Sequence, residues 1–133
     1  MPDKIQDQIK TWEDICTKLQ RDPNALPDVS MLPEKHQKFV LASIKLAYAA
    51  EALNEGWEPD WNDEWQKKWY VYTWVKADKK RPAGFGFSGT NAFWTYTDAN
   101  IGARLCFRTE ELADHARVQF EDWYQDMLLI PAA

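Results

Sequence analysis

The sequence predicts an α+β domain with two N-terminal helices, a small antiparallel sheet of three to four strands, and a C-terminal amphipathic helix packed on that sheet. Apolar residues recur at helical spacing before residue 56 and again after residue 109. Between these regions the period becomes two, and aromatic and β-branched residues dominate, as is typical of strands. A chain of 133 residues suits one domain with a buried core, so we expect a single domain over residues 1–133.

The first helix is expected to begin after Thr11, a good N-cap residue, with the acidic Asp14 in its first turn. Apolar residues then follow at helical spacing as far as Leu19. Pro23 disfavours helix at the residue before it and ends the segment. Residues 1–10 precede this helix and are expected to form a loose N-terminal segment.

The second helix is predicted over about Pro33 to Glu55. Proline is tolerated in the first turn of a helix, where its missing N–H has no helical partner to lose. The apolar stripe of this helix includes many alanines, which would let another element approach closely. Gly56 is a typical residue just beyond a helix C-terminus and is expected to end it.

An aromatic segment, residues 57–65 (WEPDWNDEW), follows the second helix. Its turn residues predict an ordered loop in which Trp57 and Trp61 act as anchors. A one- or two-turn helix starting at Pro59 is an alternative. Exposed tryptophans of this loop would instead stack on sugars or fill a partner's pocket, since tryptophan is enriched at binding hot spots.

The next segment, Trp69 to Val75, has the two-residue period of a strand, and both of its faces are apolar or aromatic. We therefore expect neither face to be an obvious solvent face. Residues 78–84 are predicted to form a turn, and further strands are expected from Phe85, over 90–96 and over 103–107. Thr109 is predicted to cap the last helix, which runs to about Leu129 with one apolar face.

Composition and charge limit the possible functions. The net charge of −5 argues against whole-surface binding to nucleic acid or to an anionic membrane. There is neither an apolar signal segment at the start nor a run of about 20 apolar residues, so we expect a cytoplasmic protein without membrane contact. Cys16 and Cys106 lie far apart among apolar neighbours and are expected to be buried thiols, not a disulfide framework.

The sequence offers no arrangement of acid, base and nucleophile. His36 and His115 stand on predicted helices among polar residues and are expected to face solvent. Ser88 lies in GFSGT, which does not match the G-x-S-x-G nucleophile elbow. We therefore expect a protein that is not an enzyme and that needs no cofactor.

Acidic residues gather around the end of the second helix, but their spacing does not match a calcium loop. We interpret them as a solvated acidic face and expect no metal site. These residues are Glu51, Glu55, Glu58, Asp60, Asp63 and Glu64.

Three segments, EALNEGWEPDW (51–61), GFGFSGT (84–90) and ARLCFRTEELADHARVQF (103–120), together with the opening KTWEDICTKL, resemble an uncharacterised family of small proteins found in phages and prophages of gut Bacteroidota. The resemblance extends over most of the chain and departs mainly between Asn62 and Arg81. It implies a phage-type protein acting in the host cell cytoplasm, and it implies no mechanism.

The aromatic content, with 8 Trp, 6 Phe and 5 Tyr, favours a binding surface. The predicted hairpin combines aromatic residues with flanking basic residues, a combination that also holds single-stranded nucleic acid. We expect a non-enzymatic interaction protein whose aromatic sheet face binds a protein partner or forms a homo-oligomer. A single-stranded nucleic-acid binder, a small-ligand sequestrant and an enzyme of unrecognised type remain alternatives. The candidate binding residues are Tyr70, Tyr72, Trp74, Phe85, Phe87, Lys76, Lys79, Lys80 and Arg81.

Overall fold

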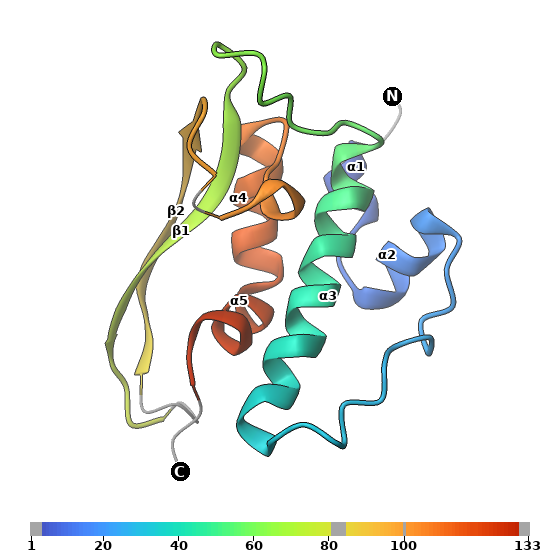
Figure 1. The fold of residues 1–133 in the computed structure, drawn as a ribbon, viewed down its shortest axis with the longest axis vertical. Helices are drawn as coiled ribbons and strands as arrows, with labels where there is room; N and C mark the ends of the chain where they lie inside the picture. Colours follow the sequence, from blue (N-terminus) through green and yellow to red (C-terminus); the bar gives the residue numbers. More distant parts are fainter. Residues whose placement is uncertain (1–3, 81–84, 100, 131–133) are drawn as a thin grey trace.

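The computed structural model describes residues 4–80, 85–99 and 101–130. Figure 1 shows the twisted two-stranded hairpin on the left, α4 and α5 beside it in the middle, and the long helix α3 to their right. The α+β prediction is confirmed. The elements, in chain order, are α1 (Ile5–Gln8), α2 (Trp12–Leu19), α3 (Glu34–Asn54), β1 (Lys68–Ala77), β2 (Phe85–Thr95), the 3-10 turn η1 (Ala103–Leu105), α4 (Glu110–Gln119) and α5 (Glu121–Leu128).

The N-terminal segment is better ordered than we expected. Residues 5–8 form α1, and the side chains of Ile5 and Ile9 are buried in the core. These two isoleucines lie four residues apart, and both contribute to the core. A reciprocal capping box then starts α2: the Asp14 N–H donates to Thr11 Oγ1, and the Thr11 N–H donates to Asp14 Oδ2, each at 3.1 Å.

The long helix α3 ends at Asn54, and Glu55 takes the left-handed conformation there, with a φ of 50°. Gly56 follows with a φ of 91°. Glycine tolerates such angles freely, whereas a residue with a Cβ adopts them at a cost. The chain therefore leaves the helix through two successive left-handed residues and not through Gly56 alone.

The strands β1 and β2 pair antiparallel, with Val71 opposite Ala92 and a register shift between Trp74 and Val75. The strands expected from Phe85 and over 90–96 are one continuous strand. The segment expected as a strand over 103–107 is mostly the turn η1. It contributes a single bridge, in which Phe107 and Trp69 exchange N–H···O bonds of 3.0 and 2.7 Å at the other edge of β1.

The predicted C-terminal helix is interrupted at Phe120, whose φ and ψ of −116° and 29° are not helical. The break lets α4 pack against both strands while α5 packs along α3. The core lies between these layers and includes Ile15, Leu53 and Phe107, all fully buried. Within the described part of the chain, no helix is both long and apolar enough to cross a membrane.

Candidate binding surface

The register of the hairpin separates its residues into two faces, because residues directly opposite each other on antiparallel strands point to the same side. Val71 and Ala92 are a buried pair that belongs to the core. Two residues along, Thr90 Oγ1 accepts a 3.0 Å hydrogen bond from Arg117 of α4. These residues mark the face covered by the helices, so the alternate residues lie on the opposite face.

That opposite face carries Tyr70, Tyr72 and Trp74 from β1 and Phe93 from β2, which we call the outer aromatic face. The rings of Tyr72 and Trp74 lie 5.0 Å apart at 72°, and those of Tyr72 and Phe93 lie 5.2 Å apart at 60°. Such tilted and edge-to-face contacts are the favoured geometries of aromatic pairs. Tyr72, Trp74 and Phe93 therefore form one continuous aromatic surface across both strands, and Tyr70 lies opposite Phe93 on the same face.

The outer aromatic face is accessible to solvent. Tyr72 is 42% exposed, Trp74 is 45% exposed and Phe93 is 38% exposed. In Figure 1 the hairpin turns this side away from the helices, and no described helix lies over it. Trp74 lies opposite Gly89, and a Cβ built on that glycine would stand 3.5 Å from the indole, so the ring packs directly over the glycine backbone. Aromatic cover of this kind stabilises a strand at glycine.

The charged side chains on the two strands of the hairpin are all basic. Neither strand contains an aspartate or glutamate. Lys76 alternates with Trp74 on the outer side and is exposed, as are Lys79 and Lys80 in the following turn. Asp78 lies in the same turn, and its carboxylate accepts a 3.0 Å hydrogen bond from the Lys80 N–H. Arg81, the remaining basic candidate, lies outside the described residues.

Not every aromatic candidate belongs to this face. Phe87 lies opposite Val75 and packs, partly buried, against the core, so we correct its assignment to the binding surface. Phe85 pairs with Ala77, and its side chain lies outside the described residues. Phe93 takes the place of these phenylalanines. Strict alternation along β2 would put Phe87 and Phe93 on one face. The register shift between Trp74 and Val75 adds one residue to β2, so the two phenylalanines lie on opposite faces.

The predicted loop anchors Trp57 and Trp61 are both half-buried. Trp61 packs beneath Lys68, whose Nζ lies 5.1 Å from the centre of its ring. Lys68 itself is fully buried, which no local sequence pattern indicates for a lysine. Its Nζ donates to the carbonyl oxygens of Asp63, Gln66 and Tyr96 at 3.3, 3.0 and 2.7 Å.

Two of the acidic residues near the end of α3, Glu51 and Glu55, make surface ion pairs. Glu55 pairs with Lys18 at 3.5 Å and with Arg108 at 3.1 Å, and Glu51 pairs with Arg21 at 3.8 Å. Among the residues that the structure describes, no three His, Cys, Asp or Glu side chains gather closely enough to hold a metal ion.

His36 is exposed, as expected. His115 is partly buried, and its Nε2 makes a hydrogen bond with the Ile9 carbonyl, which corrects the prediction that it faces solvent. Its position reflects the ordered N-terminal segment, which brings Ile9 against α4.

Cys16 and Cys106 are both free thiols and both buried, as predicted. Burial raises the pKa of the Cys16 thiol and raises the pKa of Cys106 to about 11. A thiol that stays protonated at neutral pH is a poor nucleophile. The two cysteines therefore serve as core residues.

No protein-family model, curated protein or solved structure matches this chain.

Proposed function

We propose that this protein is a non-enzymatic, phage-type interaction protein that binds a protein partner through the outer aromatic face. The single observation that supports this most strongly is the contact of Tyr72 with both Trp74 and Phe93, in a cluster whose members are 38–45% exposed. Monomeric proteins rarely leave contiguous aromatic surface open, and tyrosine and tryptophan are enriched at interface hot spots.

The charge around the face indicates the chemistry of the partner. The strands hold no acidic residue, and Lys76, Lys79 and Lys80 continue beyond the aromatic cluster toward the hairpin turn. Complementary potentials favour encounter between partners, whereas like charges oppose it. The expected partner surface is therefore apolar at its centre and neutral to acidic at the edge that meets these lysines.

Site-specific photo-crosslinking in the host cell tests this function. A photoreactive phenylalanine at position 72 should form a discrete covalent adduct with one protein, and Trp74→Ala should abolish it. The matched control places the same group at position 65, because Trp65 is 81% exposed but lies outside the outer aromatic face. Equal crosslinking from both positions, or an adduct that survives Trp74→Ala, would contradict the proposal. An adduct of twice the chain mass would identify the partner as a second copy.

A second candidate function is the binding of single-stranded nucleic acid. It is favoured by the row of aromatic side chains that continues into exposed lysines on a hairpin whose two strands hold no acidic residue. Each base stacked on an aromatic ring contributes about 1–3 kcal/mol, and the phosphate contacts weaken steeply with salt.

Fluorescence anisotropy of a labelled oligothymidylate at low and high salt separates the two functions. Nucleic-acid binding requires an affinity that falls with salt and is lost in the variant with both Lys79→Glu and Lys80→Glu. Lys35→Glu, at an exposed position on α3, is the charge-matched control. If no binding occurs even at low salt, this second function is excluded.

A further inference from the structure

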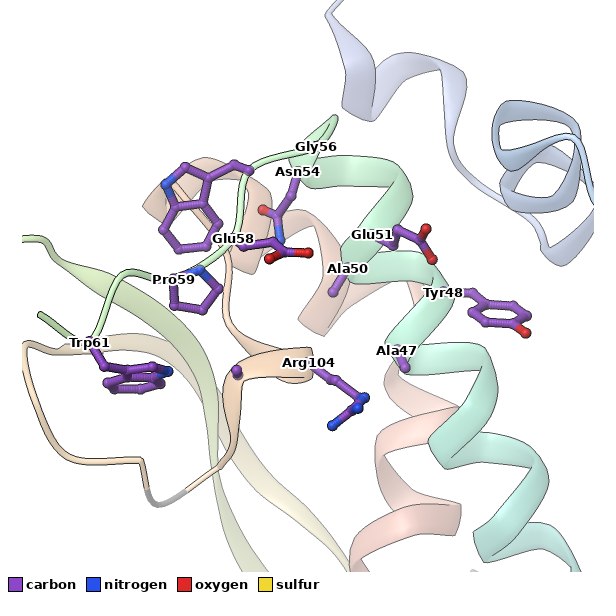
Figure 2. A pocket seen from close by; sticks show the side chains of 12 residues that line it. Ala47, Tyr48, Ala50, Glu51, Asn54, Gly56, Glu58, Pro59, Trp61 and Arg104 are labelled. Carbon is purple, nitrogen blue, oxygen red and sulfur yellow. The ribbon is translucent and has the colours of Figure 1, made fainter.

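A cleft of about 560 Å³ lies at the C-terminal end of α3, away from the outer aromatic face. Three segments form it: the last turns of α3, the loop that follows Gly56, and η1 (Figure 2). Sites for small molecules commonly have volumes of about 300–1,000 Å³ and are mostly apolar with a few polar groups. The size of this cleft suits a ligand of one or two rings.

The long walls of the cleft are apolar. Pro59 and Trp61 line the loop side, together with Trp57, and Ala47 and Ala50 line the helix side. Because the alanine side chains are short, the space opposite the tryptophans is left open. The walls therefore favour a flat apolar group stacked between an indole and the surface of the helix.

Contacts with Lys68 fix the position of the loop that carries Trp61. The Lys68 ammonium lies 5.1 Å from the centre of the Trp61 ring, on the strand side of the loop, and its hydrogen bonds to the Asp63 and Gln66 carbonyls fix the chain that follows. A wall that is already ordered lowers the entropy lost when a ligand binds.

Two opposite charges face the cleft without partners in the described structure. In Figure 2, Glu58 lies at one end of the cleft and Arg104 at the other. Neither side chain makes an ion pair or hydrogen bond with another described residue. Glu51, by contrast, lies at the rim and pairs with Arg21.

We propose that this cleft binds small ligands that have a flat apolar body and opposite charges at its two ends. A cationic end such as an ammonium lies at Glu58, a carboxylate lies at Arg104, and the body stacks against Trp61. Both charged side chains are solvent-exposed, so the stacked body supplies most of the affinity and the charges select the ligand class. This site is separate from the outer aromatic face and does not depend on the proposed function.

The probe is 4-(aminomethyl)benzoate, which carries an ammonium and a carboxylate at opposite ends of one ring. Its matched analogues are 4-methylbenzoate, which lacks the ammonium, and 4-methylbenzylamine, which lacks the carboxylate. Titrations are followed by calorimetry and by the ¹⁵N-labelled indole N–H signals of Trp57 and Trp61, assigned with Trp→Phe variants. We expect the zwitterion to bind with a Kd of about 1 mM and each analogue to bind about three- to fivefold more weakly.

Two charge-removing variants test the orientation. Glu58→Gln should weaken binding of the zwitterion and of 4-methylbenzylamine but not of 4-methylbenzoate, and Arg104→Gln should give the reverse pattern. Glu64→Gln, an exposed position of the same loop outside the cleft, is the control and should change nothing. Thermal unfolding checks that all three variants fold like the parent protein.

Three outcomes would overturn the proposal. The first is no saturable shift of the Trp57 or Trp61 signals up to about 20 mM probe, well above the expected Kd. The second is equal affinity for the three probes. The third is shifts at Trp74 in place of Trp61, which would place the probe on the outer aromatic face.

Discussion

Lys68 and Tyr96 are joined by a 2.7 Å hydrogen bond from the lysine ammonium to the tyrosine carbonyl oxygen, at the open end of the hairpin. The lysine side chain is fully buried, yet no carboxylate bonds its Nζ within the described structure. The carbonyls of Asp63 and Gln66 supply its other hydrogen bonds, and Trp61 lies beneath it. One cation therefore ties the aromatic loop to the ends of both strands.

Replacing this cation should destabilise the protein strongly. Lys68→Met keeps most of the apolar stem but leaves three carbonyl oxygens without their donor. Buried carbonyl oxygens that lose a charged hydrogen-bond donor destabilise the folded state. We therefore expect the free energy of unfolding, measured by urea denaturation, to fall by about 2–4 kcal/mol. Lys79→Met, at an exposed position of the hairpin turn, is the control and should cost little. A loss below about 1 kcal/mol at position 68 would show that water or a loop shift replaces the ammonium.

Asn54, at the end of α3, joins the helix to the segment that pairs with β1. Its Nδ2 donates to the Cys106 carbonyl at 2.9 Å, and its Oδ1 accepts from the Arg108 N–H at 3.0 Å. Both contacts are lost in Asn54→Ala, so we expect a loss of about 2–3 kcal/mol in the free energy of unfolding. Asn54→Asp retains the acceptor but loses the donor, and should also destabilise. Asn62→Ala, at an exposed loop position, should be nearly neutral, and equal effects at 54 and 62 would contradict this role.

The buried thiol of Cys106 should make stability fall at alkaline pH. Burial raises its pKa from 9.0 to about 11, so the unfolded chain releases this proton at a lower pH than the folded protein does. The contribution to stability is fully present below about pH 9 and is lost as the pH rises toward 11. Urea denaturation at pH 8, 9 and 10 should show this decline. Cys106→Ala should start from a lower stability but decline less steeply, and parallel pH profiles would refute the assignment.

The end of α2 offers a substitution that should stabilise the protein. Gln20 is exposed and has a φ of 56°, a left-handed conformation that is costly for residues with a Cβ. Gln20→Gly relieves this cost, partly offset by the extra freedom that glycine gives the unfolded chain, so we expect a gain of about 0.5 kcal/mol. Thr17→Gly, within the same helix, should instead lose about 1 kcal/mol. The prediction fails if the urea midpoint of Gln20→Gly falls below that of the parent protein.

Local sequence signals predicted the elements whose causes are local. The Thr11 capping box, the alanine-rich helix that ends near Gly56, and the helix capped by Thr109 all follow from residues within a few positions of each other. The alternation after Trp69 likewise identified β1. The buried state of both cysteines followed from their apolar neighbours.

Other features depend on residues that are distant in sequence. The break at Phe120 is matched by the packing of α5 along α3, while α4 packs against the two strands. The bridge between Trp69 and Phe107 joins positions 38 apart in sequence, and a short apolar segment does not reveal which strand edge it will meet. The ordered N-terminal isoleucines similarly depend on a core to which buried residues of α3 and α4 contribute.

The residues of the outer aromatic face also divide into those that local sequence predicts and one that requires the tertiary structure. Tyr70, Tyr72 and Trp74 were found from their alternation, because side chains two residues apart on a strand always share a face. That Phe93 and not Phe87 lies on the outer aromatic face follows only from the pairing of the two strands, because the register shift adds one residue to β2 between these two positions.

The sequence by itself determined the α+β class, the starts of α2, α3 and α4 and the aromatic character of the hairpin, because capping, periodicity and β-branching act between near neighbours. Only the tertiary structure decided which aromatic residues meet, how Lys68 is buried, and how Glu58 and Arg104 come to face one cleft. Those outcomes arise from register and packing between segments that the chain brings together only on folding, where burial of apolar surface outweighs local preference.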